Sequence, residues 1–322
     1  MDLILSIGST LLGFTILLFG GNWLVMSAVN LASRLKISPS VIGLTVVAAG
    51  TSLPEMITSI MANYKESPDI AVGNVVGSNI FNILAILGVS SLIRVNRVVP
   101  NQIYLEIPFV IFISALLWFF SMDGSLLRGE GLLFLAMFVS FMTFSVIRSR
   151  RNYSSDINNR DDKESMGQLK HLGLDIGYLT LGTVALMGGA HFALDGSIHL
   201  ARLLGLSERF IGLTIVSVGT GLPELATSSV AAFRGKGGIA VGNVVGSNLF
   251  NTLMVIGGAA TYRSLDIHPQ MLTMDFPWMV GITGALVPAY FIGKKNFNRP
   301  IGIAFLITYI TYLTLLYYSQ GT

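Results

Sequence analysis

Two glutamates, Glu55 and Glu224, stand in strongly apolar segments, where a carboxylate needs a chemical reason to be present. Glu55 ends the run Gly-Thr-Ser-Leu-Pro-Glu at Gly50–Glu55, and Glu224 ends the run Gly-Thr-Gly-Leu-Pro-Glu at Gly219–Glu224. The two glutamates are 169 positions apart. A charged side chain at the centre of a bilayer costs about 2.5–3.5 kcal/mol on insertion scales. Two carboxylates in matched positions are therefore tolerated most easily if they bind a cation.

A second polar element recurs at the same spacing. Gly73–Asn79 reads Gly-Asn-Val-Val-Gly-Ser-Asn and returns unchanged at Gly242–Asn248, and Asn82 returns as Asn251. Residues four apart share one face of a helix, and a Gly-x-x-x-Gly pair lets a helix approach its neighbour closely. The polar residues predicted to share a face are Asn74, Ser78 and Asn82 in one half and Asn243, Ser247 and Asn251 in the other.

Proline interrupts both glutamate segments. Pro54 and Pro223 lack a backbone N–H and clash with the preceding turn, so the helix is predicted to break near residues 50–54 and again at the mirrored place. A cation could bind the carbonyls freed within the lipid. The oxygen cluster expected there comes from Ala48, Thr51, Ser52 and Glu55, mirrored by Ser217, Thr220, Gly221 and Glu224. Oxygen ligands select hard cations such as Na⁺ and Ca²⁺. The structural alternative is that each glutamate caps a broken helix end and bonds to the neighbouring helix.

Composition places these motifs in a membrane. Of the 322 residues, 52% are hydrophobic and 11% are charged, with a mean hydropathy of +0.69, whereas soluble domains carry about 25% charged residues. The basic residues lie between apolar segments rather than in a block, so the net charge of +3 does not indicate nucleic-acid binding. Absence of Cys excludes disulfides and thiolate metal sites.

Apolar stretches long enough to cross a bilayer predict an all-α polytopic membrane protein with ten transmembrane helices, of which helices two and seven are broken. Because each half has five spans, the second half must enter the membrane inverted, as in many secondary transporters. The predicted organisation is a first repeat at 1–148 with its motif at 42–90, a polar linker at 149–171, and a second repeat at 172–322 with its motif at 211–259.

The distribution of Lys and Arg predicts the orientation. With the N-terminus outside, 15 of the 20 basic residues fall in inner loops, which satisfies the positive-inside rule. We therefore expect a multi-pass protein of the cell membrane with both termini outside and the linker 149–171 in the cytoplasm. Glu106 and Asp275, a further pair 169 apart, are predicted to be solvated helix-end acids at the outer mouths of spans four and nine.

The two glutamate elements, together with the two Gly-Asn-Val-Val-Gly-Ser-Asn elements, resemble the alpha repeats of the sodium/calcium exchanger family, in its compact prokaryotic form. The resemblance covers essentially the whole chain. It implies ion sites clustered at the membrane midplane, alternating access, and exchange of several Na⁺ for one Ca²⁺. Carried over position by position, it implies as ligands Ala48 and Ser217 through their carbonyls, with Thr51, Ser52, Glu55, Ser78, Asn82, Thr220, Glu224, Ser247 and Asn251.

Two departures from the family pattern refine this expectation. Gly221 stands where the family usually has Ser, so one hydroxyl is missing. Asn251 stands where some relatives, including potassium-dependent ones, carry Asp, which argues against K⁺ co-transport.

Three alternatives remain from the sequence. The related cation/proton exchangers typically carry an acid inside the second element, where this chain has Gly77 and Gly246. A cation channel would need similar ligands but not an inverted repeat. An intramembrane enzyme is the weakest alternative, because the sequence has no His-Glu-x-x-His motif and no catalytic Cys. We expect no enzyme activity, no cofactor, no nucleic-acid partner and no obligate protein partner; the expected partners are the lipid bilayer and the transported Na⁺ and Ca²⁺.

Overall fold

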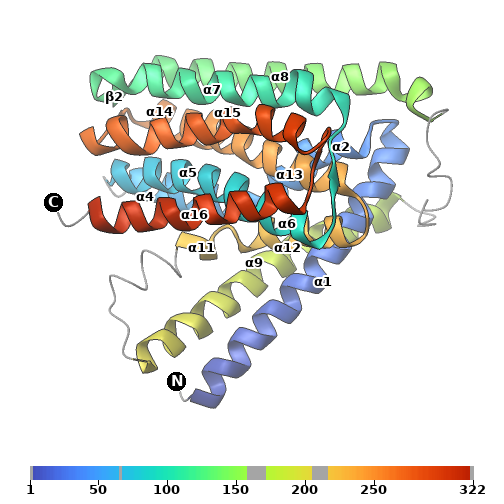
Figure 1. Cartoon of the computed structure of the whole chain (residues 1–322), viewed down its shortest axis with the longest axis horizontal. Coiled ribbons are helices and arrows are strands. Elements are labelled where there is room, and N and C mark those ends of the chain that lie inside the picture. The colour runs from blue at the N-terminus through green and yellow to red at the C-terminus, as the bar shows by residue number, and fades with distance from the viewer. Residues whose placement is uncertain (1–2, 65–66, 158–171, 205–216, 320–322) are drawn as a thin grey trace.

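The computed structural model describes residues 3–64, 67–157, 172–204 and 217–319, and these form helices joined mainly by short loops (Figure 1). The side chains of residues 153–157, 217, 317 and 319 are outside the description. Helix α8 continues through the first part of the predicted linker to Ile157, and the rest of the linker lies outside the described residues.

Each half of the chain contains long helices interrupted by short π-helical turns, which are labelled η, as is one 3₁₀ turn (η4). The first half contains α1 (Leu3–Leu35), α2 (Pro39–Ile42), η1 (Gly43–Val47), α3 (Ala48–Thr51), α4 (Leu53–Tyr64), α5 (Pro68–Phe81), η2 (Asn82–Ile86), α6 (Leu87–Ile93), β1 (Asn96–Arg97), η3 (Gln102–Glu106), α7 (Ile107–Phe120), η4 (Ser121–Asp123), β2 (Ser125–Leu126) and α8 (Arg128–Ile157). The second half contains α9 (Leu172–Leu203), α11 (Ser217–Gly219), α12 (Leu222–Phe233), α13 (Gly237–Leu249), η6 (Phe250–Ile256), α14 (Gly257–Tyr262), β3 (Leu265–Asp266), η7 (Met271–Asp275), α15 (Phe276–Ile292), β4 (Asn296–Phe297) and α16 (Arg299–Ser319).

The lengths and apolar character of these helices fit a membrane. Within the described residues, eight helices are long and apolar enough to cross a bilayer, and Pro39–Tyr64 forms a ninth span bent by 48°. The span predicted at 210–233 begins outside the described residues and continues as α11 and α12. The chain is therefore an all-α polytopic membrane protein, and the break predicted in its second span is confirmed.

The two segments that carry the repeated Asn motif lie at the centre of the molecule. Most residues of α5–η2–α6 and of α13–η6–α14 are buried, whereas α1, α8, α9 and α16 expose large apolar side chains. Figure 1 shows α1 and α9 packed side by side and inclined to the other helices. Glycines allow this pair to pack closely, because a Cβ on Gly13 would lie 2.2 Å from the Ala193 nitrogen and one on Gly189 would lie 2.8 Å from the Leu17 nitrogen.

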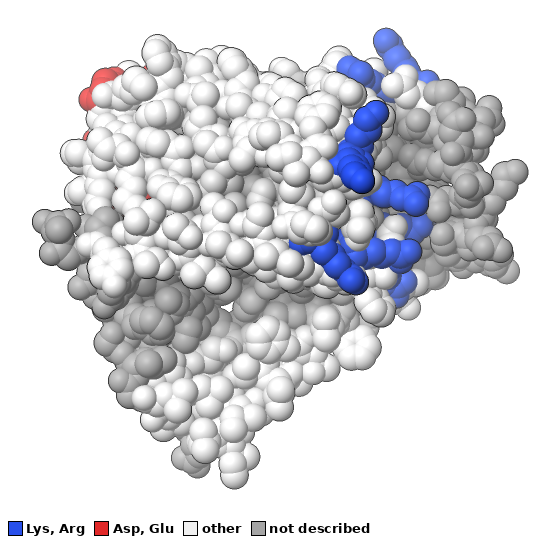
Figure 2. All heavy atoms as spheres, viewed as in Figure 1, with Lys and Arg blue, Asp and Glu red and all other residues white. Residues whose placement is uncertain are grey.

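Two small antiparallel sheets join the loops at opposite ends of the bundle. Strand β1 pairs with β4, and β2 pairs with β3. The continuous η3–α7 helix separates β1 from β2, and at 1.5 Å per residue it is about 30 Å long. Figure 2 shows the Lys and Arg side chains of this face gathered at one end, where α16 begins, and acidic side chains at the opposite end. We call these the basic end, where β1 and β4 pair, and the β2–β3 end.

The glycine pair of the second half makes the close approach that the sequence predicts. A Cβ on Gly242 would lie 2.5 Å from the Ser40 carbonyl oxygen, and one on Gly246 would lie 2.4 Å from the Leu44 carbonyl oxygen. Helix α13 therefore packs directly on the first part of the broken second span. In the first half, Gly73 and Gly77 line a cavity, and the segment equivalent to residues 40–44, residues 209–213, lies outside the described part of the chain.

Candidate cation site

The break in the second span positions Glu55 inside the protein. Helix α3 ends at Thr51, Ser52 adopts a non-helical conformation with φ −83° and ψ 8°, and α4 starts at Leu53. Pro54 has no N–H to continue the preceding helix. Glu55 follows in the first turn of α4, where its side chain is 1% exposed. A helix N-terminus favours a carboxylate electrostatically, so the break also stabilises this buried acid.

The mirrored break positions Glu224 opposite Glu55. Gly221 has φ −84° and ψ 3°, almost the conformation of Ser52, and α12 begins at Leu222. Glu224 is 1% exposed, and its Oε1 accepts a hydrogen bond of 3.1 Å from the Ser52 hydroxyl. Because Ser52 lies three residues before Glu55, this bond places Glu224 beside the helix break that carries Glu55. The two halves therefore bring their acids to one place, as the repeat predicts.

The repeated Asn motif joins the halves through matched hydrogen bonds. Asn82 donates from Nδ2 to the Asn248 Oδ1 at 2.9 Å, and the mirrored bond runs from the Asn251 Nδ2 to the Asn79 Oδ1 at 3.2 Å. Asn82 begins η2 and Asn251 lies in η6. Single π-helical turns inside α-helices are frequent at functional sites, and here both follow the motif directly.

A second matched pair supports the broken helices. The Asn74 Nδ2 donates to the Ser59 hydroxyl at 3.0 Å and to the Glu55 carbonyl at 3.3 Å. In the other half the Asn243 Nδ2 donates to the Ser228 hydroxyl at 3.0 Å, and the Thr51 hydroxyl donates to the Asn243 Oδ1 at 3.3 Å. Asn74 and Asn243 therefore fix the backbone and hydroxyl groups around the glutamates.

Several oxygens at this place have no hydrogen-bond partner among the described residues. They are Glu55 Oε2, Glu224 Oε2, Ser247 Oγ and Asn251 Oδ1, and all four residues are at most 1% exposed. A buried polar atom left unpaired costs about 1–3 kcal/mol, and more when it is charged. Carboxylate, hydroxyl and amide oxygens are the ligands of hard cations, so the donor set fits Na⁺ or Ca²⁺. No cluster of three or more His, Cys, Asp or Glu occurs in the described residues, so neutral oxygens would complete any coordination.

Most of the residues predicted for the site are buried in this region. Those that are at most 6% exposed are Ala48, Thr51, Ser52, Glu55, Ser78, Asn82, Glu224, Ser247 and Asn251. Thr220 is half-buried, and Ser217 begins α11 with its side chain outside the description. The Ala48 carbonyl is only partly freed by the break: it accepts a 2.9 Å hydrogen bond from the Ser52 nitrogen, which leaves its second lone pair for another partner.

Packing leaves no room for a side chain at Gly221, the position that mirrors Ser52, in this structure. A Cβ on Gly221 would lie 2.6 Å from Cε1 and 2.7 Å from Cδ1 of Phe81. The ring of Phe81 is buried and packs against Tyr309, with ring centroids 5.6 Å apart. A serine at position 221 would therefore require the Phe81 ring to move, a contact that the sequence alone does not reveal.

Sequence reasoning missed Asn79 and Asn248 as site residues. Both are 1% exposed. Beyond the two matched bonds, Asn248 donates to the Asn79 carbonyl at 3.1 Å and Asn79 donates to the Thr252 hydroxyl at 3.0 Å. Both recur at the spacing of 169 residues, which is the signal that could identify them, but they lie off the helical face that Asn74, Ser78 and Asn82 share.

The prediction for Glu106 and Asp275 is wrong in part. Glu106 is 1% exposed, and its Oε2 has no partner in the described structure, so it is not a solvated acid. Asp275 is half-buried and accepts a 3.1 Å hydrogen bond from the Tyr312 hydroxyl. Each acid follows its strand, β1 or β3, by nine residues, so the pair lies at opposite ends of the bundle rather than at one outer surface.

Comparisons with known proteins identify the family to which the chain is related. The family model described as sodium/calcium exchanger protein matches residues 5–147 and 174–318. The sodium/calcium exchanger MaX1 of Methanosarcina acetivorans is 31% identical over 342 residues, which cover 96% of this chain and 97% of that protein. The inner membrane protein YrbG of Escherichia coli is 31% identical over 321 residues, which cover 98% of each chain.

The same relationship appears in three dimensions. The structure of the sodium-calcium exchanger NCX_Mj, soaked with zero Na⁺ and Ca²⁺, superposes with a TM-score of 0.83 at 30% sequence identity, covering 98% of this chain and 100% of that one. The polar residues of both repeats, buried together at two mirrored helix breaks, are thus set in the fold of a known exchanger, and the chain belongs to the sodium/calcium exchanger family.

Proposed function

We propose that this protein exchanges several Na⁺ for one Ca²⁺ by alternating access. The observation that carries the proposal is the pair of buried carboxylates, Glu55 and Glu224, each in the first turn after a mirrored helix break and each with one unpartnered oxygen in the described structure. The proposed ligands are Ala48 and Ser217 through their carbonyls, and Thr51, Ser52, Glu55, Ser78, Asn82, Thr220, Glu224, Ser247 and Asn251.

Charge balance supports this exchange. Two carboxylates neutralise one Ca²⁺, whereas three Na⁺ would leave one excess positive charge. Binding of one Ca²⁺ or of several Na⁺ requires the second acid, because one carboxylate cannot offset two or more positive charges in a region where desolvation is costly. Exchange of more than two Na⁺ for one Ca²⁺ therefore moves net charge and responds to the membrane potential.

The surroundings of the carboxylates favour Na⁺ over H⁺ as the driving ion. A proton-coupled exchanger needs a further group that takes up and releases protons. Gly77 and Gly246 occupy the positions where cation/proton exchangers typically carry an acid, and in the described structure Gly246 is packed against the Leu44 backbone. The relative from Methanosarcina acetivorans is itself a sodium/calcium exchanger.

A cavity next to the site supports alternating access. It has a volume of about 230 Å³ and is lined by Asn74, Ser78, Asp275 and Tyr312, among others. It lies beside η7, toward the β2–β3 end. On the mirrored face, Ser247 and Glu106 are at most 1% exposed. We propose that in this state ions reach Ser78 through the cavity at the β2–β3 end. In the opposite state, a mirrored cavity would give access to Ser247 from the basic end.

The charge distribution supports an orientation. We propose that the basic end (Figure 2) faces the cytoplasm, because positive residues are retained on that side of cell membranes. The β2–β3 end and both termini then face outward.

Ca²⁺ uptake into proteoliposomes tests the proposal. Vesicles with purified protein are loaded with Na⁺ and diluted into Na⁺-free medium containing labelled Ca²⁺, and the matched vesicles receive a pH gradient instead. We expect uptake with the Na⁺ gradient, faster when a K⁺ ionophore clamps the potential to remove excess charge, and little with the pH gradient. Uptake driven by the pH gradient in the absence of Na⁺ would replace Na⁺ by H⁺ as the driving ion.

Glu55→Gln and Glu224→Gln extend this test to the site. Each substitution removes one charge at nearly constant volume, and each is expected to abolish Ca²⁺ uptake. Asp69→Asn, near the start of α5 on the exposed surface, serves as the control that removes a charge elsewhere. Near-normal uptake by either glutamine variant would exclude a site with two essential carboxylates.

A further inference from the structure

The basic end contains a cavity that the exchange of cations does not require. It has a volume of about 520 Å³ and is lined by residues of α2, the segment around β1, and the start of α13. This volume lies within the roughly 300–1,000 Å³ typical of small-ligand pockets. The charged residues among those lining it are Arg94, Arg97 and Lys236, and among the described residues no acidic side chain lines it.

The loop that carries the two exposed arginines is fixed by contacts of its backbone and of Gln102. Strand β1 pairs Arg97 with Asn296 of β4. Gln102 accepts a 3.0 Å bond from the Val99 nitrogen and donates a 3.0 Å bond to the Gly238 carbonyl, which ties the loop to α13. The Arg94 guanidinium lies against Gly235, where an added Cβ would be 2.7 Å from Nη1. The guanidinium group of each arginine is a planar fork of donors that suits phosphate.

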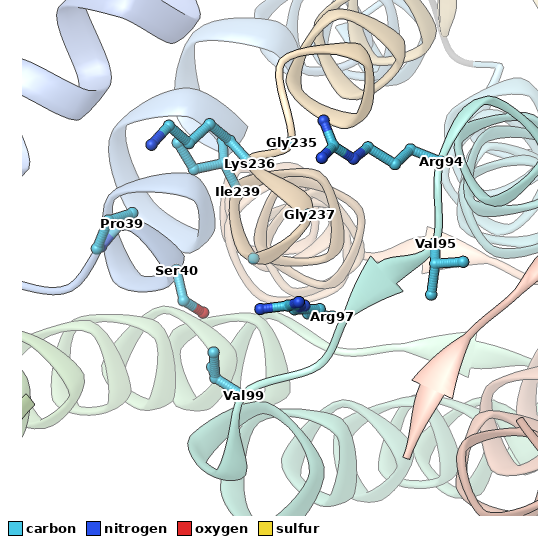
Figure 3. A pocket seen from close by; sticks show the side chains of 11 residues that line it. Pro39, Ser40, Arg94, Val95, Arg97, Val99, Gly235, Lys236, Gly237 and Ile239 are labelled. Atoms are coloured by element: carbon cyan, nitrogen blue, oxygen red, sulfur yellow. The ribbon is translucent and has the colours of Figure 1, made fainter. Parts of the chain in front are cut away.

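A buried hydroxyl and a helix N-terminus complete the cavity. Ser40 is 3% exposed, and its Oγ has no hydrogen-bond partner among the described residues. Figure 3 shows this oxygen and the Arg97 guanidinium facing each other across the cavity. Gly237 and Gly238 begin the 13-residue helix α13, and the first N–H groups of a helix have no partner within it and attract anions.

We propose that this cavity binds the phosphate group of an anionic molecule at the basic end of the membrane domain. Arg94 and Arg97 supply charge and paired donors, Ser40 supplies a hydroxyl, and the start of α13 supplies backbone N–H groups. General retention of positive residues on the cytoplasmic side would explain the charges, but it explains neither the unpartnered buried hydroxyl nor the convergence of these donors on one cavity. The phosphate belongs either to an anionic phospholipid headgroup or to a soluble phosphate compound.

Binding is measured on the full-length, delipidated protein in neutral detergent. Native mass spectrometry detects bound phosphatidylglycerol, with phosphatidylcholine as the zwitterionic comparison, and ³¹P NMR line broadening detects inorganic phosphate. Binding of phosphatidylglycerol alone assigns the site to a lipid headgroup, and binding of inorganic phosphate assigns it to the soluble anion; either result supports the proposal.

Matched variants separate the cavity from the general charge of this end. Arg94→Gln with Arg97→Gln removes two charges from the cavity, and Lys294→Gln with Lys295→Gln removes two charges from the neighbouring β4 loop, outside the lining. We expect the first pair to weaken binding at least about tenfold, equivalent to about 1.4 kcal/mol, and the second pair to change it less than about twofold.

Two single variants test the remaining donors. Ser40→Ala removes the hydroxyl and is expected to weaken binding about fivefold. Gly238→Ala adds a methyl group whose nearest atoms are 3.9 and 4.0 Å away, so it narrows the cavity without a clash. We expect this variant to bind the phosphate group more weakly and to keep the melting temperature of the wild-type protein. Absence of binding to the wild-type protein by all probes, or equal losses from the two double variants, would overturn the proposal.

Discussion

The mirrored glycines Gly77 and Gly246 lie in different surroundings, and alternating access predicts opposite consequences for a methyl group at each. A Cβ on Gly246 would lie 2.4 Å from the Leu44 carbonyl oxygen and 2.8 Å from the Ala48 Cβ. A Cβ on Gly77 would meet no atom within 4 Å in the described structure, and Gly77 lines the cavity beside Ser78. If the halves exchange their surroundings in the opposite state, Gly77 becomes the closely packed glycine.

The size of the effect follows from these distances. Ordinary van der Waals contact begins at 3.4 Å, so an alanine at the packed position forces the facing backbone away by about 1 Å. Overpacking of this kind costs about 1–3 kcal/mol, which changes the ratio of two states by roughly 5- to 150-fold. Replacing Gly by Ala also favours the helix by about 1 kcal/mol, so Gly77→Ala is not expected to unfold the protein.

The assay compares Gly77→Ala with Gly281→Ala, a helical glycine whose Cβ would likewise meet nothing within 4 Å in the described structure. We expect normal melting in detergent for both variants, and Na⁺-driven Ca²⁺ uptake reduced at least about fivefold for Gly77→Ala alone. Because the chain has no Cys, Met271→Cys in the cavity lining can report on the state. An impermeant maleimide should label it faster in the Gly77→Ala background. Wild-type uptake with unchanged labelling would refute the reasoning.

Gly221→Ser should lower Ca²⁺ uptake because the serine side chain would collide with Phe81. Adding Phe81→Leu to this variant should restore uptake. If Gly221→Ser alone instead lowered the Na⁺ concentration needed for half-maximal exchange, the reasoning would be contradicted. Asp175 is buried and accepts hydrogen bonds from Asn30 and Arg34. Asp175→Asn should therefore lower the free energy of unfolding by about 1–3 kcal/mol, while Ca²⁺ uptake per folded molecule is preserved. Thermal melting and uptake assays measure the two effects, and an unchanged melting temperature would show that these contacts do not stabilise the protein. In Lys295→Cys, the new thiol should be labelled by an impermeant reagent added on the cytoplasmic side and not by one added outside. The reverse result would overturn the proposed orientation.

The polar motifs could be predicted from the sequence because they violate the apolar composition around them. Pro54 and Pro223 predict breaks by a local rule, and the structure places the breaks at Ser52 and around Gly221. Two carboxylates at one spacing predict that the halves meet, since a lone buried charge is costly. The family, the helical membrane fold and the break in the second span follow from such local signals.

The features that the sequence does not predict depend on which helices pack together. The Phe81 ring, at the end of α5, packs so closely on Gly221, just before α12, that a Cβ there would lie 2.6 Å from it. Nothing near either residue in the sequence indicates this contact. Glu106 looks like a helix-end acid by its position before a proline, yet tertiary packing buries it. The bonds that Asn79 makes across the two halves likewise require the three-dimensional arrangement of α5 and α13.

Equilibrium binding of labelled Ca²⁺ to the purified protein tests the central claim most directly. We expect the wild-type protein to bind Ca²⁺ and Na⁺ to displace it with a steep, cooperative concentration dependence, because several Na⁺ replace one Ca²⁺ at shared oxygens. Glu55→Gln and Glu224→Gln should each lose Ca²⁺ binding while melting as folded proteins. Ca²⁺ binding that persists in either variant, or that Na⁺ does not displace, would contradict a shared site built on the two mirrored carboxylates.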